Sequence, residues 1–181
     1  MNEVTRREFV KAASAVTAVG ATTLPAWAVQ ENRDPIKIGF IGCGGRGTGA
    51  ANQALNANEN AVIWAMGDAF EDRLTSSQKA LLDEQGSRAE IPKERQFVGF
   101  DAYQKVIDSG VDMVILTTPP HFRPAHIAAA VKAKKHVFCE KPMAVDGSGV
   151  RSVMESTKLA KENGTNLMSG FCWRYNLPIR A

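Results

Sequence analysis

The chain has 181 residues, of which 44% are hydrophobic and 23% charged, with a formal net charge of +3. This length suits one domain with its own core, and the composition is that of an ordinary soluble globular protein. The small and scattered charge argues against nucleic-acid binding, and no run of about 18 or more strongly apolar residues predicts a permanent membrane span.

Residues 1–28 have the pattern of an export signal. Arg6 and Arg7 precede a weakly apolar stretch, and Ala26-Trp27-Ala28 is a small-x-small cleavage site. We therefore expect a twin-arginine signal, recognised by the Tat export machinery, and a periplasmic location for the protein. A polar linker over residues 29–35 would follow. The alternative is an amphipathic N-terminal helix that stays attached.

Beyond the linker, short apolar runs alternate with helical patterns. We expect strands over residues 36–41, 61–66, 96–99, 111–116, 136–139 and 166–171, and helices over 48–56, 70–84, 124–133 and 148–163, with a short helix from 101 and a loop over 86–95. The strands are continuously apolar, as strands are when helices cover both faces of a parallel sheet. The sequence thus predicts the α/β class, with a Rossmann-type doubly wound parallel sheet over residues 36–170.

Two smaller expectations concern single residues. Asp101 should cap the short helix that follows it, with Gln104 reaching back to complete a capping box. The three cysteines, Cys43, Cys139 and Cys172, are too few and too widely spaced for a disulfide framework. We expect three buried thiols and no metal site.

A glycine-rich run joins the first expected strand to the first expected helix, and it reads Gly42-Cys43-Gly44-Gly45-Arg46-Gly47. This spacing, G-x-G-x-x-G in a strand–turn–helix context, predicts a dinucleotide-binding loop. The first glycine would allow a tight turn, the second a close approach of the backbone to the pyrophosphate, and the third close packing of helix on strand. The helix N-terminus would offer N–H groups to the phosphates.

Asp68 ends the second strand, about twenty residues beyond the glycine loop, where an acid can bind the adenosine ribose hydroxyls. It would also repel a 2′-phosphate, so we expect NAD as the cofactor. The alternative is that Asp68 caps the next helix. NADP stays open as a cofactor because Arg46 lies in the phosphate loop and could pair with a phosphate or only with solvent.

Two further motifs follow the fourth and fifth strands, whose carboxyl ends should border the ligand crevice. Thr118 and Pro119 form either part of the cofactor site or a plain turn. Glu140 and Lys141 come after the fifth strand, where Lys141 could polarise a substrate hydroxyl or move a proton. The alternative for Lys141 is a surface lysine in a turn.

Other candidates are weaker. His121 and His126 are interpreted as polar residues at a helix start rather than as acid–base groups. Trp173 and Arg174, after the sixth strand, could form a wall of the cofactor site or pack against another domain. Spacing alone does not separate these two interpretations.

Taken together, these residues resemble the glucose-fructose oxidoreductase / inositol dehydrogenase / rhizopine catabolism (Gfo/Idh/MocA) family over residue 36 to the end of the chain. The resemblance rests on the glycine loop with its preceding strand, Asp68, Thr118-Pro119, the run 133–142 that ends in Glu-Lys-Pro, and the run 170–175. It implies NAD(P)-dependent hydride transfer on a sugar, polyol or related hydroxyl compound. Lys141 would lie beside the nicotinamide and the reacting hydroxyl.

The resemblance also implies a second domain, a large and mostly antiparallel sheet that supplies substrate contacts, an Asp/His pair and the oligomer interface. Residues 171–181 would be only the start of that domain, so we expect a truncated chain that forms oligomers only with the missing part. Arg123 stands where the family often has histidine, which points to a different substrate or cofactor contact. The alternatives are an NAD-dependent glycosidase of the same fold and a non-catalytic remnant.

Overall fold

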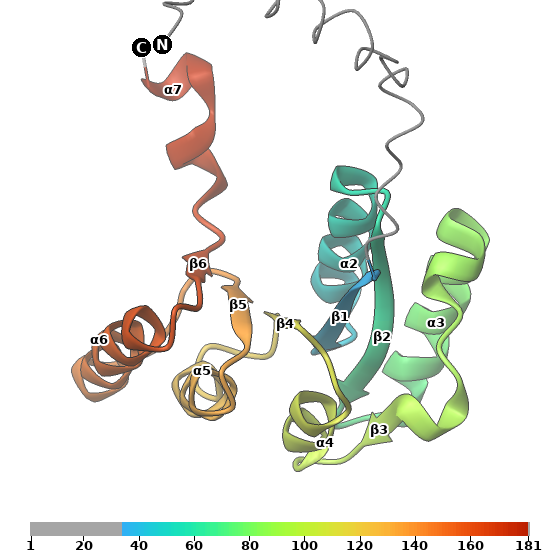
Figure 1. The fold of residues 1–181 in the computed structure, drawn as a ribbon, viewed down its shortest axis with the longest axis horizontal. Coiled ribbons are helices and arrows are strands. Elements are labelled where there is room, and N and C mark those ends of the chain that lie inside the picture. Colours follow the sequence, from blue (N-terminus) through green and yellow to red (C-terminus); the bar gives the residue numbers. More distant parts are fainter. Residues whose placement is uncertain (1–33, 181) are drawn as a thin grey trace, which may run out of the picture. The chain divides into compact units, whose positions relative to one another are not determined.

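The computed structural model describes residues 34–180, so the expected export signal and nearly all of the linker lie outside the described part. Within it, six parallel strands form one sheet in the order β3-β2-β1-β4-β5-β6 (Figure 1). The strands are β1 (Ile36–Ile41), β2 (Ala61–Asp68), β3 (Gln96–Val98), β4 (Met113–Leu116), β5 (His136–Cys139) and β6 (Leu167–Ser169). The expected doubly wound parallel sheet is therefore confirmed.

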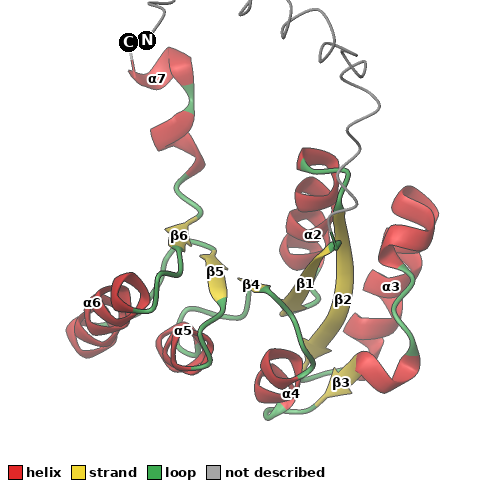
Figure 2. Ribbon diagram, viewed as in Figure 1, coloured by secondary structure: helices red, strands yellow, loops and turns green. Residues whose placement is uncertain are grey.

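Helices connect the strands and cover the sheet (Figure 2). They are α2 (Gly45–Ala57), α3 (Glu71–Gln85), α4 (Ala102–Asp108), α5 (Arg123–Lys132) and α6 (Gly147–Glu162). The short α7 (Leu177–Arg180) follows β6 and lies beyond the sheet. From β1 the chain first builds outward to β2 and β3, then returns to add β4, β5 and β6 on the other side of β1. The strand order therefore reverses between β1 and β4, and ligands of such sheets bind beyond the carboxyl ends of the strands at this point.

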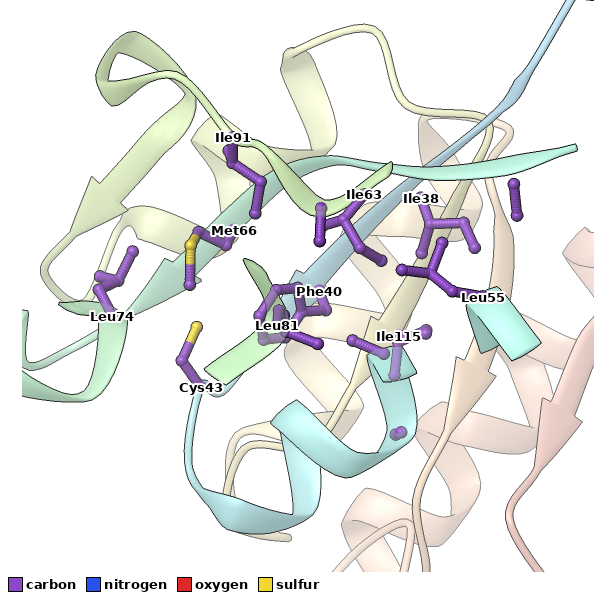
Figure 3. Close-up of a cluster of buried hydrophobic side chains, with 14 residues drawn as sticks. Ile38, Phe40, Cys43, Leu55, Ile63, Met66, Leu74, Leu81, Ile91 and Ile115 are labelled. Atoms are coloured by element: carbon purple, nitrogen blue, oxygen red, sulfur yellow. The ribbon is translucent and has the colours of Figure 1, made fainter. Parts of the chain in front are cut away.

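Apolar side chains fill the space on both sides of the sheet. On one side, side chains from the central strands pack against α2 and α3 in the cluster drawn in Figure 3, which includes Phe40, Leu55, Met66, Leu74 and Leu81. On the other side, a second cluster joins the strands to α4, α5 and α6. Both faces of the central strands are thus covered, which is why these strands are apolar without alternation.

Close packing of α4 depends on two glycines in the strands beneath it. A Cβ atom at Gly39 in β1 would lie 2.5 Å from Val106 Cγ1, and one at Gly67 in β2 would lie 2.9 Å from Val106 Cγ2. Val106 is completely buried. The side chain of Val106 therefore occupies the space that two strand side chains would otherwise fill.

Three local expectations were wrong. Asp101 precedes α4 but has helical backbone angles (φ −91°, ψ −2°) and makes no side-chain cap hydrogen bond. Its carboxylate instead pairs with Lys105 Nζ at 2.8 Å, which lowers the pKa of Asp101, and Gln104 bonds to Asp108 rather than reaching back. Residues 86–95 contain two short 3-10 turns, Gly86–Ala89 and Lys93–Arg95.

The third error concerns a cysteine. Cys43 and Cys139 are buried, but Cys172 is exposed because it lies in the 3-10 turn Cys172–Tyr175 beyond the end of the sheet. Burial raises the pKa of the Cys139 thiol to about 12 and that of Cys43 further, so both thiols are protonated at neutral pH.

Among residues 34–180, no helix has the length and apolar character needed to cross a membrane.

Candidate cofactor and active site

A cleft of about 460 Å³ lies at the carboxyl ends of β1, β2 and β4, where the strand order reverses. Its walls are the glycine loop, the segment after β2, the segment after β4, and parts of α4 and α5. Of the candidates from the sequence, it is lined by Gly42, Gly44, Arg46, Gly47, Asp68, Thr118 and Pro119. The structure therefore brings these residues together in one cavity.

Two glycines of the loop are required by the packing of the protein itself. Gly42 has a φ of +96°, and a Cβ atom there would lie 2.7 Å from Thr118 N. A Cβ atom at Gly47 would overlap the Gly42 carbonyl oxygen and lie 2.7 Å from Thr117 Oγ1. Thr117 Oγ1 donates to Gly42 O at 2.6 Å, so this threonine joins the end of β4 to the glycine loop.

The other two glycines face open space. Gly44 has ordinary backbone angles (φ −70°, ψ −179°), and a Cβ atom there would meet only Arg73 Nη1, at 4.0 Å. A Cβ atom at Gly45 would have no neighbour within 4 Å. Neither the packing nor the backbone of the described chain therefore explains why residue 44 or 45 is glycine.

The N-terminus of α2 offers hydrogen-bond donors to the same space. The first bond of this helix runs from Thr48 N to Gly44 O, so the N–H groups of Gly45, Arg46 and Gly47 have no acceptor within the helix. Its N-cap, Gly44, makes no side-chain bond, and its first turn holds no acidic residue. Open space, unpaired N–H groups and the positive end of a helix dipole fit the pyrophosphate of a dinucleotide.

Asp68 connects the glycine loop to the end of β2. Its Oδ2 accepts from Cys43 N at 2.6 Å, and its Oδ1 accepts from Phe70 N at 3.0 Å. It does not cap α3 by a side-chain bond, since the N-cap of that helix is Phe70. Each carboxylate oxygen can accept a further hydrogen bond, and Asp68 lines the cleft. Arg73 also lines the cleft and makes no hydrogen bond or ion pair to residues 34–180.

An aromatic wall closes one side of the cleft and was not anticipated from the sequence. Phe100 and Phe122 lie with ring centroids 6.3 Å apart, and Phe100 is 77% exposed. Tyr103 stacks on His126 at 4.2 Å. Apolar residues outside strands and helices gave no signal, because nothing in their spacing distinguishes a ligand-facing ring from a core ring.

His126 lies in the first turn of α5, as expected for a residue at a helix start, but its ring is buried in this wall. Burial lowers the pKa of His126 to about 4, so the ring is neutral at physiological pH. Its Nδ1 lies 3.3 Å from Thr118 Oγ1. His121, by contrast, is exposed and packs edge-on against Phe122.

Lys141, Trp173 and Arg174 line a different cavity, of about 750 Å³, that also contains Gly170 and Ile179. Lys141 is exposed there, at the carboxyl end of β5. The structure thus groups these three candidates with one another and separates them from the cleft at the glycine loop. The sequence names all three as candidates for the cofactor site and leaves open a surface role for Lys141 and domain packing for Trp173 and Arg174.

Glu140 links the two cavities. It is buried, and its carboxylate forms an ion pair with Arg46 of the glycine loop and accepts from Lys141 N at 3.2 Å. A Cβ atom at Gly170 would lie 2.8 Å from Glu140 Oε1, so the carboxylate occupies space that only a glycine leaves open. The side chain of Glu140 therefore connects the glycine loop with the segment that carries Lys141.

Arg123 was not anticipated as a structural link. It is 6% exposed, and its guanidinium donates to the backbone carbonyls of Thr118, Glu140 and Pro142. It is not among the residues that line either cavity. An arginine that directly follows a turn reads as a surface residue, and only the fold shows what it bonds to.

Comparisons with known proteins agree with this geometry. The model of the Gfo/Idh/MocA family, described as an oxidoreductase family with an NAD-binding Rossmann fold, matches residues 36–171. Myo-inositol 2-dehydrogenase of Thermotoga maritima is 31% identical over 141 residues, which are 78% of this chain and 37% of the relative. A glycosyl hydrolase family 109 protein of Solibacter usitatus is 30% identical over 152 residues, which are 80% of this chain and 34% of the relative.

A solved structure shows the same fold. The crystal structure of a probable dehydrogenase from Thermotoga maritima superposes with a TM-score of 0.60 at 28% identity, over 77% of this chain and 37% of that one. The chain therefore spans little more than a third of the length of the relatives that it matches. With the family model matched over its whole sheet, the chain belongs to the Gfo/Idh/MocA oxidoreductase family and has its NAD-binding Rossmann fold.

Proposed function

We propose that the protein is an NAD(P)-dependent oxidoreductase that oxidises a hydroxyl group of a polyol, a sugar or a related compound. The observation that carries this proposal is the glycine loop, where a Cβ atom at Gly44 would meet open space and the first N–H groups of α2 have no acceptor among residues 34–180. A phosphate needs both the space and the donors. The family, whose description is an NAD-binding oxidoreductase fold, supports the same conclusion.

The proposal assigns cofactor binding to the cleft at the glycine loop and proton transfer to the cavity that Lys141 lines. Gly44 and the N-terminus of α2 would hold the pyrophosphate, and Thr118 with Pro119 would border the middle of the dinucleotide. Bound NAD would supply its nicotinamide ring as the acceptor for hydride from the carbon that carries the hydroxyl. The amine of Lys141 would take the hydroxyl proton as a general base, at the wall formed with Trp173 and Arg174.

NAD is the proposed cofactor and NADP the alternative. Asp68 borders the cleft with a carboxylate that can accept the ribose hydroxyls and would repel a 2′-phosphate. Arg46 is engaged by Glu140, which leaves it less available as a partner for a 2′-phosphate. Arg73 is the cation in this cleft that has no partner among residues 34–180.

The substrate class is tested by following NADH in the whole protein with free polyols, free sugars and glycosides. Net NADH formation with a free polyol such as an inositol is the expected result, since the myo-inositol 2-dehydrogenase is among the relatives. Release of an aglycone without net NADH would instead identify a glycosidase, the activity suggested by the glycosyl hydrolase family 109 relative. Neither reaction, with NAD still bound, would point to a binding protein.

We also propose that the protein is exported by the Tat machinery to the periplasm and cleaved after Ala28. The paired Arg6 and Arg7 and the small-x-small site support this, and all of them lie outside the described residues. Replacing both arginines by lysine should leave unprocessed protein in the cytoplasm, as measured by fractionation and intact mass. Normal processing of the double-lysine variant would refute the route.

A further inference from the structure

Arg123 occupies a place that is unfavourable for a cation. It is the first residue of α5, where the helix dipole repels positive charge, and it is 6% exposed. Burial lowers the pKa of its guanidinium, although an arginine stays charged at neutral pH. A buried charge is costly unless its hydrogen bonds are satisfied, so the contacts it makes must offset that cost.

Those contacts surround Lys141. Arg123 Nη1 donates one hydrogen to Glu140 O at 2.6 Å and the other to Pro142 O at 2.5 Å. These oxygens belong to the residues directly before and directly after Lys141 in the chain. The backbone of Lys141 is therefore held on both sides by a single nitrogen.

The same guanidinium reaches the cofactor cleft. Arg123 Nε donates to Thr118 O at 2.6 Å, and Thr118 lines that cleft. Three donors in the rigid plane of one guanidinium thus fix the segment after β5 relative to the segment after β4. No other side chain among residues 34–180 bonds to the backbone carbonyls of both segments.

We propose that Arg123 is a positioning residue that holds Lys141 at a fixed place relative to the cofactor cleft. The inference rests on the proposed role of Lys141 in proton transfer. It assigns a function to a residue that touches neither cavity and acts only through the backbone that it binds. A displacement of about 1 Å at a reacting group can cost about 10²-fold in rate, so the loss of this link should be visible in turnover.

The test uses Arg123→Met and Arg123→Lys in the whole protein, with Arg151→Met as the matched control, since Arg151 is an exposed arginine on α6. Arg123→Met should lower kcat by about 10²-fold while changing the affinity for NAD by less than about threefold. Arg123→Lys keeps the charge but loses the planar fork, so it should fold like the parent and rescue only part of kcat. Arg151→Met should match the parent.

A double variant separates a positioning role from a structural one. If Arg123 acts through Lys141, adding Arg123→Met to Lys141→Met should lower kcat by less than about threefold further. If the two effects multiply instead, Arg123 acts on the fold or on another step, and the proposal is overturned. Thermal unfolding of each variant identifies any that has lost the fold, in which case Arg123→Lys carries the comparison.

Hydrogen exchange gives a readout that does not depend on activity. Arg123→Lys should speed amide exchange in residues 139–144 and leave residues 36–68 unchanged, because two of the lost bonds end on Glu140 and Pro142 and none ends in residues 36–68. Unchanged exchange in 139–144 would overturn the proposal. If Lys141→Met alone turns over like the parent, the proposed function of Lys141 fails, and the exchange result still decides whether Arg123 holds this segment.

Discussion

The glycine loop and the region around Lys141, which are the two ends of the site, are formed by different kinds of chemical groups. At the glycine loop, the walls are backbone: Gly42 and Gly47 are required by packing, while Gly44 and Gly45 leave room and donors for a ligand. At the Lys141 end, buried charged side chains set the geometry, with Glu140 bound to Arg46 and Arg123 bound to three carbonyls. The glycine loop therefore requires positions without side chains, whereas the Lys141 end requires particular charged side chains.

This difference predicts how each end responds to mutation. At Gly42 and Gly47 the glycine loop is disturbed by any added atom, whatever its chemistry, because the loop is close-packed at these two positions. A segment held by an arginine fork is disturbed only when donors are lost, because the carbonyls that it binds stay in place. Four predictions, in order of decreasing expected effect, test or sharpen this contrast.

Lys141→Met should produce the largest effect. It keeps most of the side-chain length but removes the proton acceptor, and a general acid–base group contributes about 10²–10⁴-fold, so turnover should fall by that factor. NAD affinity should stay close to that of the parent, since the glycine loop is not touched. Steady-state kinetics with an NAD titration measure both, and Lys158→Met, an exposed lysine on α6, serves as the control. A turnover within about threefold of the parent would make Lys141 a structural residue.

Two glycine variants should separate fold from binding at the other end. Gly47→Ala places its methyl group against the Gly42 carbonyl, so it should destabilise the protein by about 3 kcal/mol. Gly44→Val meets open space and should cost at most about 1 kcal/mol, the scale of an N-cap change, yet it should abolish NAD binding. Chemical unfolding and NAD titration of both variants provide the check. Tight NAD binding by Gly44→Val would show that the loop is only a turn.

The burial of His126 predicts that the free energy of unfolding depends on pH. Its pKa falls from 6.5 to about 4 on folding, so the unfolded chain binds a proton in this range that the folded chain does not. Its contribution is fully present above about pH 6.5 and is lost as the pH falls to about 4, by about 3 kcal/mol. His126→Gln should lack this part of the slope in urea unfolding measured across that range. Identical slopes in parent and variant would contradict the burial of the ring.

Asp68→Asn should have the smallest effect, on cofactor choice. Removal of the negative charge should lower the preference for NAD over NADP by about tenfold, because a 2′-phosphate is no longer repelled. Dissociation constants for both cofactors measure the ratio. Asp72→Asn, an exposed acid in the first turn of α3, is the matched control. An unchanged ratio would assign Asp68 to holding the loop alone, through Cys43 N and Phe70 N.

The sequence predicted the sheet well because its signals were local. Continuous apolar runs marked each strand, and the glycine run stood at the end of the first one. Strand ends were less accurate: β4 begins at Met113 rather than at residue 111, and the sixth strand is shorter than expected, at Leu167–Ser169.

The contacts that organise the site were not predictable in the same way. Arg123 bonds to carbonyls far away in the chain, and Gly39 and Gly67 are glycines because of Val106 in α4. Such requirements arise only when separate segments meet in the fold. Glu140 and Lys141 were identified by their place after a strand, but no pattern indicated that they and the glycine loop border different cavities.

The contacts of Glu140 have an evolutionary consequence. Its carboxylate needs the absence of a side chain at Gly170 and a cation at Arg46, although these three positions lie far apart in the chain. A shorter acid at position 140 would leave an empty space beside Gly170. A neutral residue there would leave Arg46 without its ion-pair partner. The three positions are therefore expected to covary, and an alignment of homologues in which residue 140 changes should show compensating changes at 46 and 170.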